Sequence, residues 1–154
     1  MTSVNTATKN KMSKAEDQAA FLIAYSAKQS CPISNLKLQK LLYFAQCYAL
    51  ISENRKLFEE PIEAWAFGPV VSDVYILYKQ YGGANILGPA RNTEPISKKD
   101  RQILIAVFDK FRNWSATDLT QLTLNQRPWQ DAYAEGRKNE IPVSSIKSFF
   151  SKEG

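Results

Sequence analysis

Apolar side chains recur every three or four residues along most of this chain, which is the spacing of one face of an α-helix. The first such stretch follows Ser13, where the sequence Ser-Lys-Ala-Glu has the form of a capping box. It is expected to end near Gln29, before Pro32. The same spacing predicts further helices that begin near residues 71, 97, 115, 128 and 142.

A second helix, predicted for residues 36–53, differs from the others because apolar residues cover most of its circumference. A helix of this kind is buried, so we expect it at the centre of the domain, with Ser34 or Asn35 as its N-terminal cap. Lys37 and Lys40 interrupt its apolar surface. Two alternatives stay open: one of the two lysines pairs with Glu59, Glu60 or Glu63 of the following segment, or both reach solvent along their apolar stems.

Helical spacing gives way to alternation between residues 57 and 67, where aromatic residues are frequent. This alternation predicts a short strand, with Leu57-Phe58 as its expected partner in a small β-ribbon. Gly68-Pro69 is then expected to turn the chain into the next helix. The predicted fold is therefore mainly α: a compact helical domain, residues 13–154, with a central buried helix and a β-ribbon, after a flexible extension formed by residues 1–12.

Composition narrows the classes of function. The chain has no histidine, so it has no imidazole for a catalytic triad and no histidine ligand for zinc. Its two cysteines form neither a disulfide framework nor a C-x-x-C metal pair. No apolar run reaches membrane-spanning length, and the first residues lack the apolar core of a signal peptide. We therefore expect a cytoplasmic protein that is not an enzyme and needs no cofactor or metal.

Two other classes of function stay open from the residues alone. The chain has 20 Lys and Arg against 15 Asp and Glu, and the resulting net charge of +5 would suit a nucleic-acid-binding regulator. These basic residues nevertheless form no long run, which makes nucleic acid the less expected partner. Glu59, Glu60 and Glu63 could serve an enzyme that uses carboxylates, although acidic residues beside a turn are usually solvated.

Aromatic residues beside the predicted turn are the most unusual local feature. Trp65 and Phe67 precede Gly68-Pro69, and Tyr75 follows in the next helix. Rigid aromatic side chains at such a place can anchor a partner protein, because Trp and Tyr are favoured at binding hot spots. They can equally fill the core, where large aromatic side chains are usually found.

Three motifs resemble those of a known family, the Panacea (SocA- or GepA-like, phage-associated) antitoxin domain. Residues 37–46 resemble its first signature, and residues 62–71 resemble its second and most specific one. Residues 119–123, with Pro128-Trp129 after them, are similar to a third and looser signature. The chain departs from that third signature at Thr123-Leu124, where relatives commonly have a Thr-His pair.

The resemblance implies a protein that neutralises a cognate toxin, encoded nearby, by binding it directly. In one branch of the family the antitoxin also delivers its toxin to an AAA+ protease. The candidates for contact with the partner are Tyr43, Trp65, Phe67 and Tyr75. The motif residues expected to support the structure are Lys40, Gly68, Pro69 and Trp129.

Overall fold

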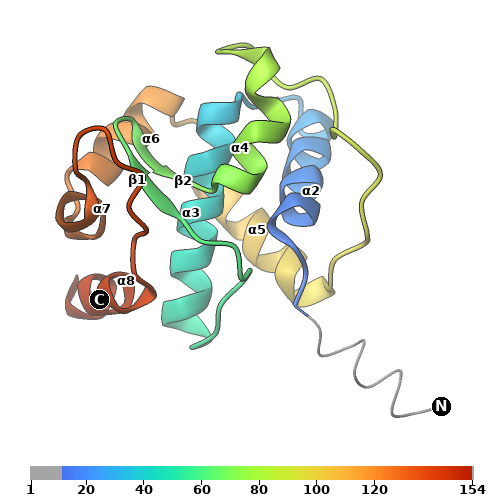
Figure 1. Ribbon diagram of the computed structural model, residues 1–154. Coiled ribbons are helices and arrows are strands. Elements are labelled where there is room, and N and C mark those ends of the chain that lie inside the picture. Colours follow the sequence, from blue (N-terminus) through green and yellow to red (C-terminus); the bar gives the residue numbers. More distant parts are fainter. Residues whose placement is uncertain (1–11, 154) are drawn as a thin grey trace.

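Helix α3 (Asn35–Ser52) runs through the middle of the molecule, and the other elements pack around it (Figure 1). The structure is a computed structural model and describes residues 12–153. Ser34 caps α3, because its side chain accepts a hydrogen bond of 3.2 Å from the amide of Lys37. The predicted central helix is confirmed, since most of its apolar side chains, Leu38 and Leu41 among them, are buried, and only Tyr48 and Ile51 near its end are exposed.

The remaining elements are mainly helical, with one small hairpin of two strands among the described residues. In chain order they are α2 (Ala15–Lys28), β1 (Glu63–Trp65), β2 (Gly68–Val70), α4 (Ser72–Tyr78), the 3₁₀ helix η1 (Lys79–Tyr81), α5 (Lys98–Lys110), α6 (Ala116–Leu124), α7 (Arg127–Ala132) and α8 (Val143–Glu153). The predicted fold class is therefore confirmed. Ser97 and Ser115 cap α5 and α6 as the sequence predicts, each accepting a hydrogen bond from an amide three residues later.

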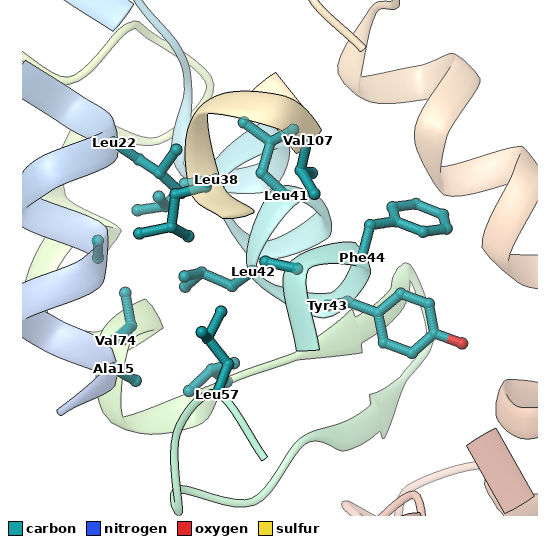
Figure 2. Packing of buried hydrophobic residues seen from close by; sticks show 14 of the residues in the cluster. Ala15, Leu22, Leu38, Leu41, Leu42, Tyr43, Phe44, Leu57, Val74 and Val107 are labelled. Carbon is teal, nitrogen blue, oxygen red and sulfur yellow. The ribbon is translucent and has the colours of Figure 1, made fainter. Parts of the chain in front are cut away.

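The core lies on both sides of α3. Figure 2 shows Leu38 and Leu42 on the side that faces α2, where Leu22 meets them. Helix α5 runs antiparallel to α3. Lys37, at the start of α3, contacts the segment just after α5, and Arg55, just after the end of α3, contacts the first turn of α5. The hairpin lies between α3 and α6, next to the C-terminal helices (Figure 1).

The hairpin confirms the predicted β-ribbon but not the predicted pairing. Strand β1 pairs with β2, in the register that sets Trp65 opposite Gly68, so Ala66 and Phe67 form the turn. Gly68 and Pro69 therefore lie within a strand rather than forming the turn.

Leu57 and Phe58 are fully buried and are held by a side chain of α3 rather than by a strand. The amide of Leu57 donates to Gln46 Oε1 at 2.6 Å, and Gln46 Nε2 donates to the carbonyl of Phe58 at 2.8 Å. Gln46 thus satisfies the backbone groups that a strand partner would otherwise have used.

The N-terminus of α2 also differs from the prediction. Ser13 does not cap this helix; its hydroxyl donates to Asp100 of α5 at 3.0 Å. Instead, Glu60 Oε2 accepts from the amide of Ala15 at 3.0 Å, so a carboxylate from a distant loop takes the place of a local cap. The predicted extension at residues 1–12 lies outside the described residues, apart from Met12. No helix of residues 12–153 is long and apolar enough to cross a membrane.

Candidate partner-binding site

Three of the four predicted contact residues meet at the hairpin. The ring centroid of Trp65 lies 4.9 Å from that of Tyr75 and 5.5 Å from that of Phe67, while Phe67 and Tyr75 are 6.1 Å apart. All three side chains are half-buried, so part of each ring faces solvent. We call these three residues the hairpin surface. A surface of rigid, mutually packed aromatic side chains can bind a partner with little loss of side-chain entropy.

Gly68 holds the base of this hairpin in a conformation that no other residue fits. Its φ is +104°, and a Cβ atom there would lie 2.8 Å from Lys40 Cε and 2.9 Å from Thr123 Oγ1. Glycine is thus required both for the backbone dihedral and for the close approach of α3 and α6.

Lys40 lies directly beneath the turn and is fully buried. Its Nζ donates to the carbonyl of Pro69 at 3.2 Å and lies 5.5 Å from the centroid of the Phe67 ring. Neither expected outcome for this lysine occurs, because it does not reach solvent and no glutamate of the described residues forms an ion pair with it. Burial lowers the pKa of Lys40 to about 7, since the charged ammonium loses its hydration.

Lys37, one turn earlier on α3, forms no ion pair with a described carboxylate either. Its Nζ donates to the carbonyl of Arg112 at 3.0 Å, beyond the end of α5. Burial lowers the pKa of Lys37 as well, and the nearby Cys31 acts in the opposite direction. Both lysines of the buried helix therefore hold backbone carbonyls of neighbouring elements rather than carboxylates.

Both edges of the hairpin are covered. On the β2 side, Pro69 has no amide to satisfy, and the amide of Val71 donates to Gln39 Oε1 at 2.9 Å. On the β1 side, the amide of Ala64 donates to the carbonyl of Asn139 at 2.8 Å, and the amide of Ile141 donates to the carbonyl of Ile62 at 2.8 Å. A partner therefore cannot add a strand here and must contact side chains instead.

Trp129 supports the hairpin from α7. Its indole Nε1 donates to the carbonyl of Trp65 at 2.7 Å, and its ring stacks on that of Tyr133 with centroids 4.7 Å apart. The structure thus gathers the predicted motif residues around one feature, with Lys40 and Gly68 below the turn and Trp129 behind the first strand.

Charged side chains lie beside Trp65, and two of them, Lys138 and Glu140, were not indicated by the sequence. Its indole Nε1 donates to Glu63 Oε1 at 2.8 Å, and Lys138 Nζ lies 4.7 Å from the centroid of the ring. Glu140 forms an isolated antiparallel bridge with Glu63. Periodicity could not place Lys138 and Glu140 here, because they follow α7 in an irregular segment that a pattern of helical faces does not describe.

Comparison with known proteins agrees with the motifs. The family model described as "Antitoxin SocA-like, Panacea domain" matches residues 38–130, which is more than half of the chain. The protein belongs to this family. The matched span runs from α3 to α7 and includes the whole hairpin.

One curated relative within this family is Antitoxin SocA of Caulobacter vibrioides (strain NA1000 / CB15N). It is 40% identical over 79 residues, which cover 51% of this chain and 42% of SocA. The chain thus aligns with less than half of the length of that relative. No solved structure matches the chain.

Tyr43, the fourth predicted contact residue of this Panacea domain, lies in the core. It is fully buried, its ring packs 5.1 Å from that of Phe44, and its hydroxyl donates to Gln126 Oε1 at 3.3 Å. Figure 2 shows Tyr43 and Phe44 on the side of α3 that faces away from α2. Burial raises the pKa of Tyr43. Sequence reasoning could not separate Tyr43 from the surface tyrosines, because apolar residues surround α3 on nearly every side.

The departure at Thr123-Leu124 lies close to the hairpin. Thr123 is fully buried, and its Oγ1 donates to the carbonyl of Thr120 at 2.7 Å. The same Oγ1 atom lies against Gly68. Leu124, where relatives commonly have histidine, is half-buried at the end of α6.

The three glutamates considered for an enzyme each have a separate structural role. Glu59 is largely exposed and pairs with Lys56 at 3.4 Å, Glu60 caps α2, and Glu63 accepts from Trp65. Their carboxylates do not converge on one point. Within residues 12–153 no group of three His, Cys, Asp or Glu side chains is arranged to hold a metal ion.

Proposed function

We propose that this protein is the antitoxin of a toxin–antitoxin pair and that it neutralises its toxin by direct binding through the hairpin surface. Membership of the SocA-like Panacea family supports the role of antitoxin. The observation that carries the choice of surface is the cluster of three half-buried aromatic side chains, two from the hairpin and Tyr75 from α4, beside strands whose outer edges are both covered.

The physical argument for this surface is preorganisation. Gly68, Lys40 and Trp129 fix the turn from below and behind, so the rings need little ordering when a partner arrives. Aromatic side chains of this kind are the residues that most often dominate binding free energy. Occlusion of a toxin needs an interface of roughly 1,200–2,000 Å², of which the hairpin surface would form the centre.

The test is co-expression with the neighbouring open reading frame. That frame should be toxic alone, and the native chain should restore growth and co-purify with the toxin. Tyr75→Ala should weaken rescue, whereas Tyr48→Ala, which removes a tyrosine that is 46% exposed on α3, should not. A toxin that the native chain neither binds nor neutralises contradicts the proposal.

The fate of the toxin separates two mechanisms of neutralisation. If the antitoxin acts by blocking, the toxin accumulates in a stable complex. If it acts as a proteolytic adaptor, the toxin level falls in cells that contain the AAA+ protease and recovers in cells that lack it. If the toxin is neither held in a complex nor degraded, and the chain instead binds duplex DNA with an affinity that falls as salt rises, the nucleic-acid-binding regulator is favoured.

A further inference from the structure

The face of the hairpin that carries Trp65 extends onto a third segment. The bridge between Glu63 and Glu140, together with the hydrogen bonds of Ala64 and Ile141, pairs residues 139–141 with β1 in an antiparallel register. This register sets Lys138 opposite Trp65 and Glu140 opposite Glu63. Side chains of directly opposed residues lie on the same face, so these four side chains are neighbours.

Lys138 occupies the aromatic face of Trp65. Its Nζ is 4.7 Å from the ring centroid, within the range of a cation–π interaction. The side chain is exposed, lies in a loop and forms no ion pair with any described carboxylate. It is therefore held mainly by the ring, and an incoming cation could displace it.

Two carboxylates face this place. Glu63 and Glu140 are a non-hydrogen-bonded pair, because the backbone hydrogen bonds are made by the residues on either side of them. Opposed side chains lie closest together in pairs of this type. Like charges in such a pair repel each other. Glu63 is fixed next to the ring, because it accepts from the indole Nε1 of Trp65 at 2.8 Å. Two carboxylates and one loosely held ammonium leave a net negative charge beside the Trp65 ring. The other cation near the three rings, Lys40, is buried below Phe67 and donates to the carbonyl of Pro69.

We propose that this place is a binding site for a cationic side chain, an arginine or lysine from a basic segment of the partner, and that Lys138 fills it while the partner is absent. The identification of the partner as a toxin rests on the proposed function, whereas the chemistry of the site does not. The site explains why Trp65 is half-exposed between acidic neighbours. It also predicts that Lys138 competes with the partner.

The test is a titration of the full chain with a penta-arginine peptide and, separately, a penta-glutamate peptide. The indole N–H signals of the three tryptophans are followed by NMR. Penta-arginine should shift the Trp65 signal and leave that of Trp114 in place, and penta-glutamate should shift neither. A Trp65 signal that responds to penta-glutamate, or to neither peptide, overturns the proposal.

Two charge variants have opposite expected effects. Lys138→Gln removes the competing cation and should tighten penta-arginine binding roughly two- to fivefold, while Glu140→Gln should weaken it by a similar factor. The matched controls are Lys99→Gln and Glu94→Gln, which change the net charge equally at exposed positions elsewhere and should have smaller effects. If the control variants change the affinity for penta-arginine as much as the site variants do, the binding is non-specific and the proposal fails.

The same variants separate this proposal from the proposed function. If the toxin binds the native chain, Lys138→Gln should strengthen the complex and Glu140→Gln should weaken it. Reversed signs would show that the partner supplies an acidic segment, which overturns the cation site but leaves the antitoxin role intact. If no toxin binds at all, the proposed function fails, and the peptide titration still decides the chemistry of the site.

Discussion

Two clusters of three aromatic residues can be compared in this molecule: the hairpin surface and a helix cluster formed by Phe44, Phe111 and Trp114. Neighbouring ring centroids lie 4.9–6.1 Å apart in the first and 4.8–5.3 Å apart in the second. A lysine lies near a ring in both, Lys40 at 5.5 Å from Phe67 and Lys110 at 5.8 Å from Phe111. The geometry of the rings alone therefore does not distinguish them.

The clusters differ in burial and in what holds them. Phe44 and Phe111 are 8% and 4% exposed between α3 and α5, and only Trp114 extends outwards. The three side chains of the hairpin surface are half-buried, and the surface is fixed from below by Lys40, a buried lysine without a carboxylate partner among the described residues. The helix cluster fills the space between α3 and α5, whereas the hairpin surface leaves aromatic side chains partly accessible above a lysine whose burial disfavours its charged form. That pattern is typical of a binding site.

The largest loss of stability should come from the helix cluster. Phe111→Ala removes a buried ring between α3 and α5 and should lower the free energy of unfolding by about 3–5 kcal/mol. Urea denaturation of the native chain and the variant measures this. A loss smaller than that caused by Trp65→Ala would show that the two clusters have been assigned the wrong way round.

Gly68→Ala should come next and should act where the hairpin meets α3 and α6. The positive φ of +104° and the contacts of 2.8–2.9 Å to Lys40 and Thr123 predict a loss of about 2–5 kcal/mol. The control is Gly83→Ala, where no atom lies within 4 Å of the added Cβ. Equal midpoints of urea unfolding for the two variants would contradict the account of the turn.

The buried lysine should make stability depend on pH. Lys40 has a pKa of about 7 in the folded chain and 10.5 as its ordinary value. Between these values the unfolded chain binds more protons, so the free energy of unfolding should rise with pH, by about 2 kcal/mol from pH 6.5 to 8.5. Well below pH 7 both states carry the proton, and the contribution of Lys40 should become constant.

Lys40→Met provides the control for that pH dependence. The variant keeps an unbranched chain in the same place and removes the titrating group, so its unfolding free energy should change less between pH 6.5 and 8.5 than that of the native chain. Lys37, whose pKa is also lowered by burial, remains in both proteins and cancels in the comparison. An unchanged slope in Lys40→Met would show that other groups cause the dependence.

The sequence predicted those parts of the fold that depend on local chemistry. Ser34, Ser97 and Ser115 mark helix starts because a cap needs only its own side chain and the next turn. The pairing of β1 was missed because Gln46, remote in sequence, satisfies the backbone of Leu57. Local reasoning cannot anticipate a side chain that replaces a strand.

The candidate site was predicted in part for the same reason. The sequence could indicate that Trp65, Phe67 and Tyr75 lie together, because they are close in sequence and unusually aromatic. Tyr43, named with them, is instead buried in the core, because burial is decided by which elements pack against α3. Lys138 was missed because its position over Trp65 depends on the pairing of residues 139–141 with β1, which no local pattern indicates.

The most direct test of the hairpin surface is the affinity of the purified chain for its co-encoded toxin, measured by calorimetry for the native protein, Trp65→Ala and Trp114→Ala. Both variants remove a partly exposed tryptophan, one from each cluster. Trp65→Ala should weaken binding by about 30-fold or more, as loss of a hot-spot residue does, and Trp114→Ala should change it by roughly twofold at most. Equal losses, or a larger loss for Trp114→Ala, would contradict the account.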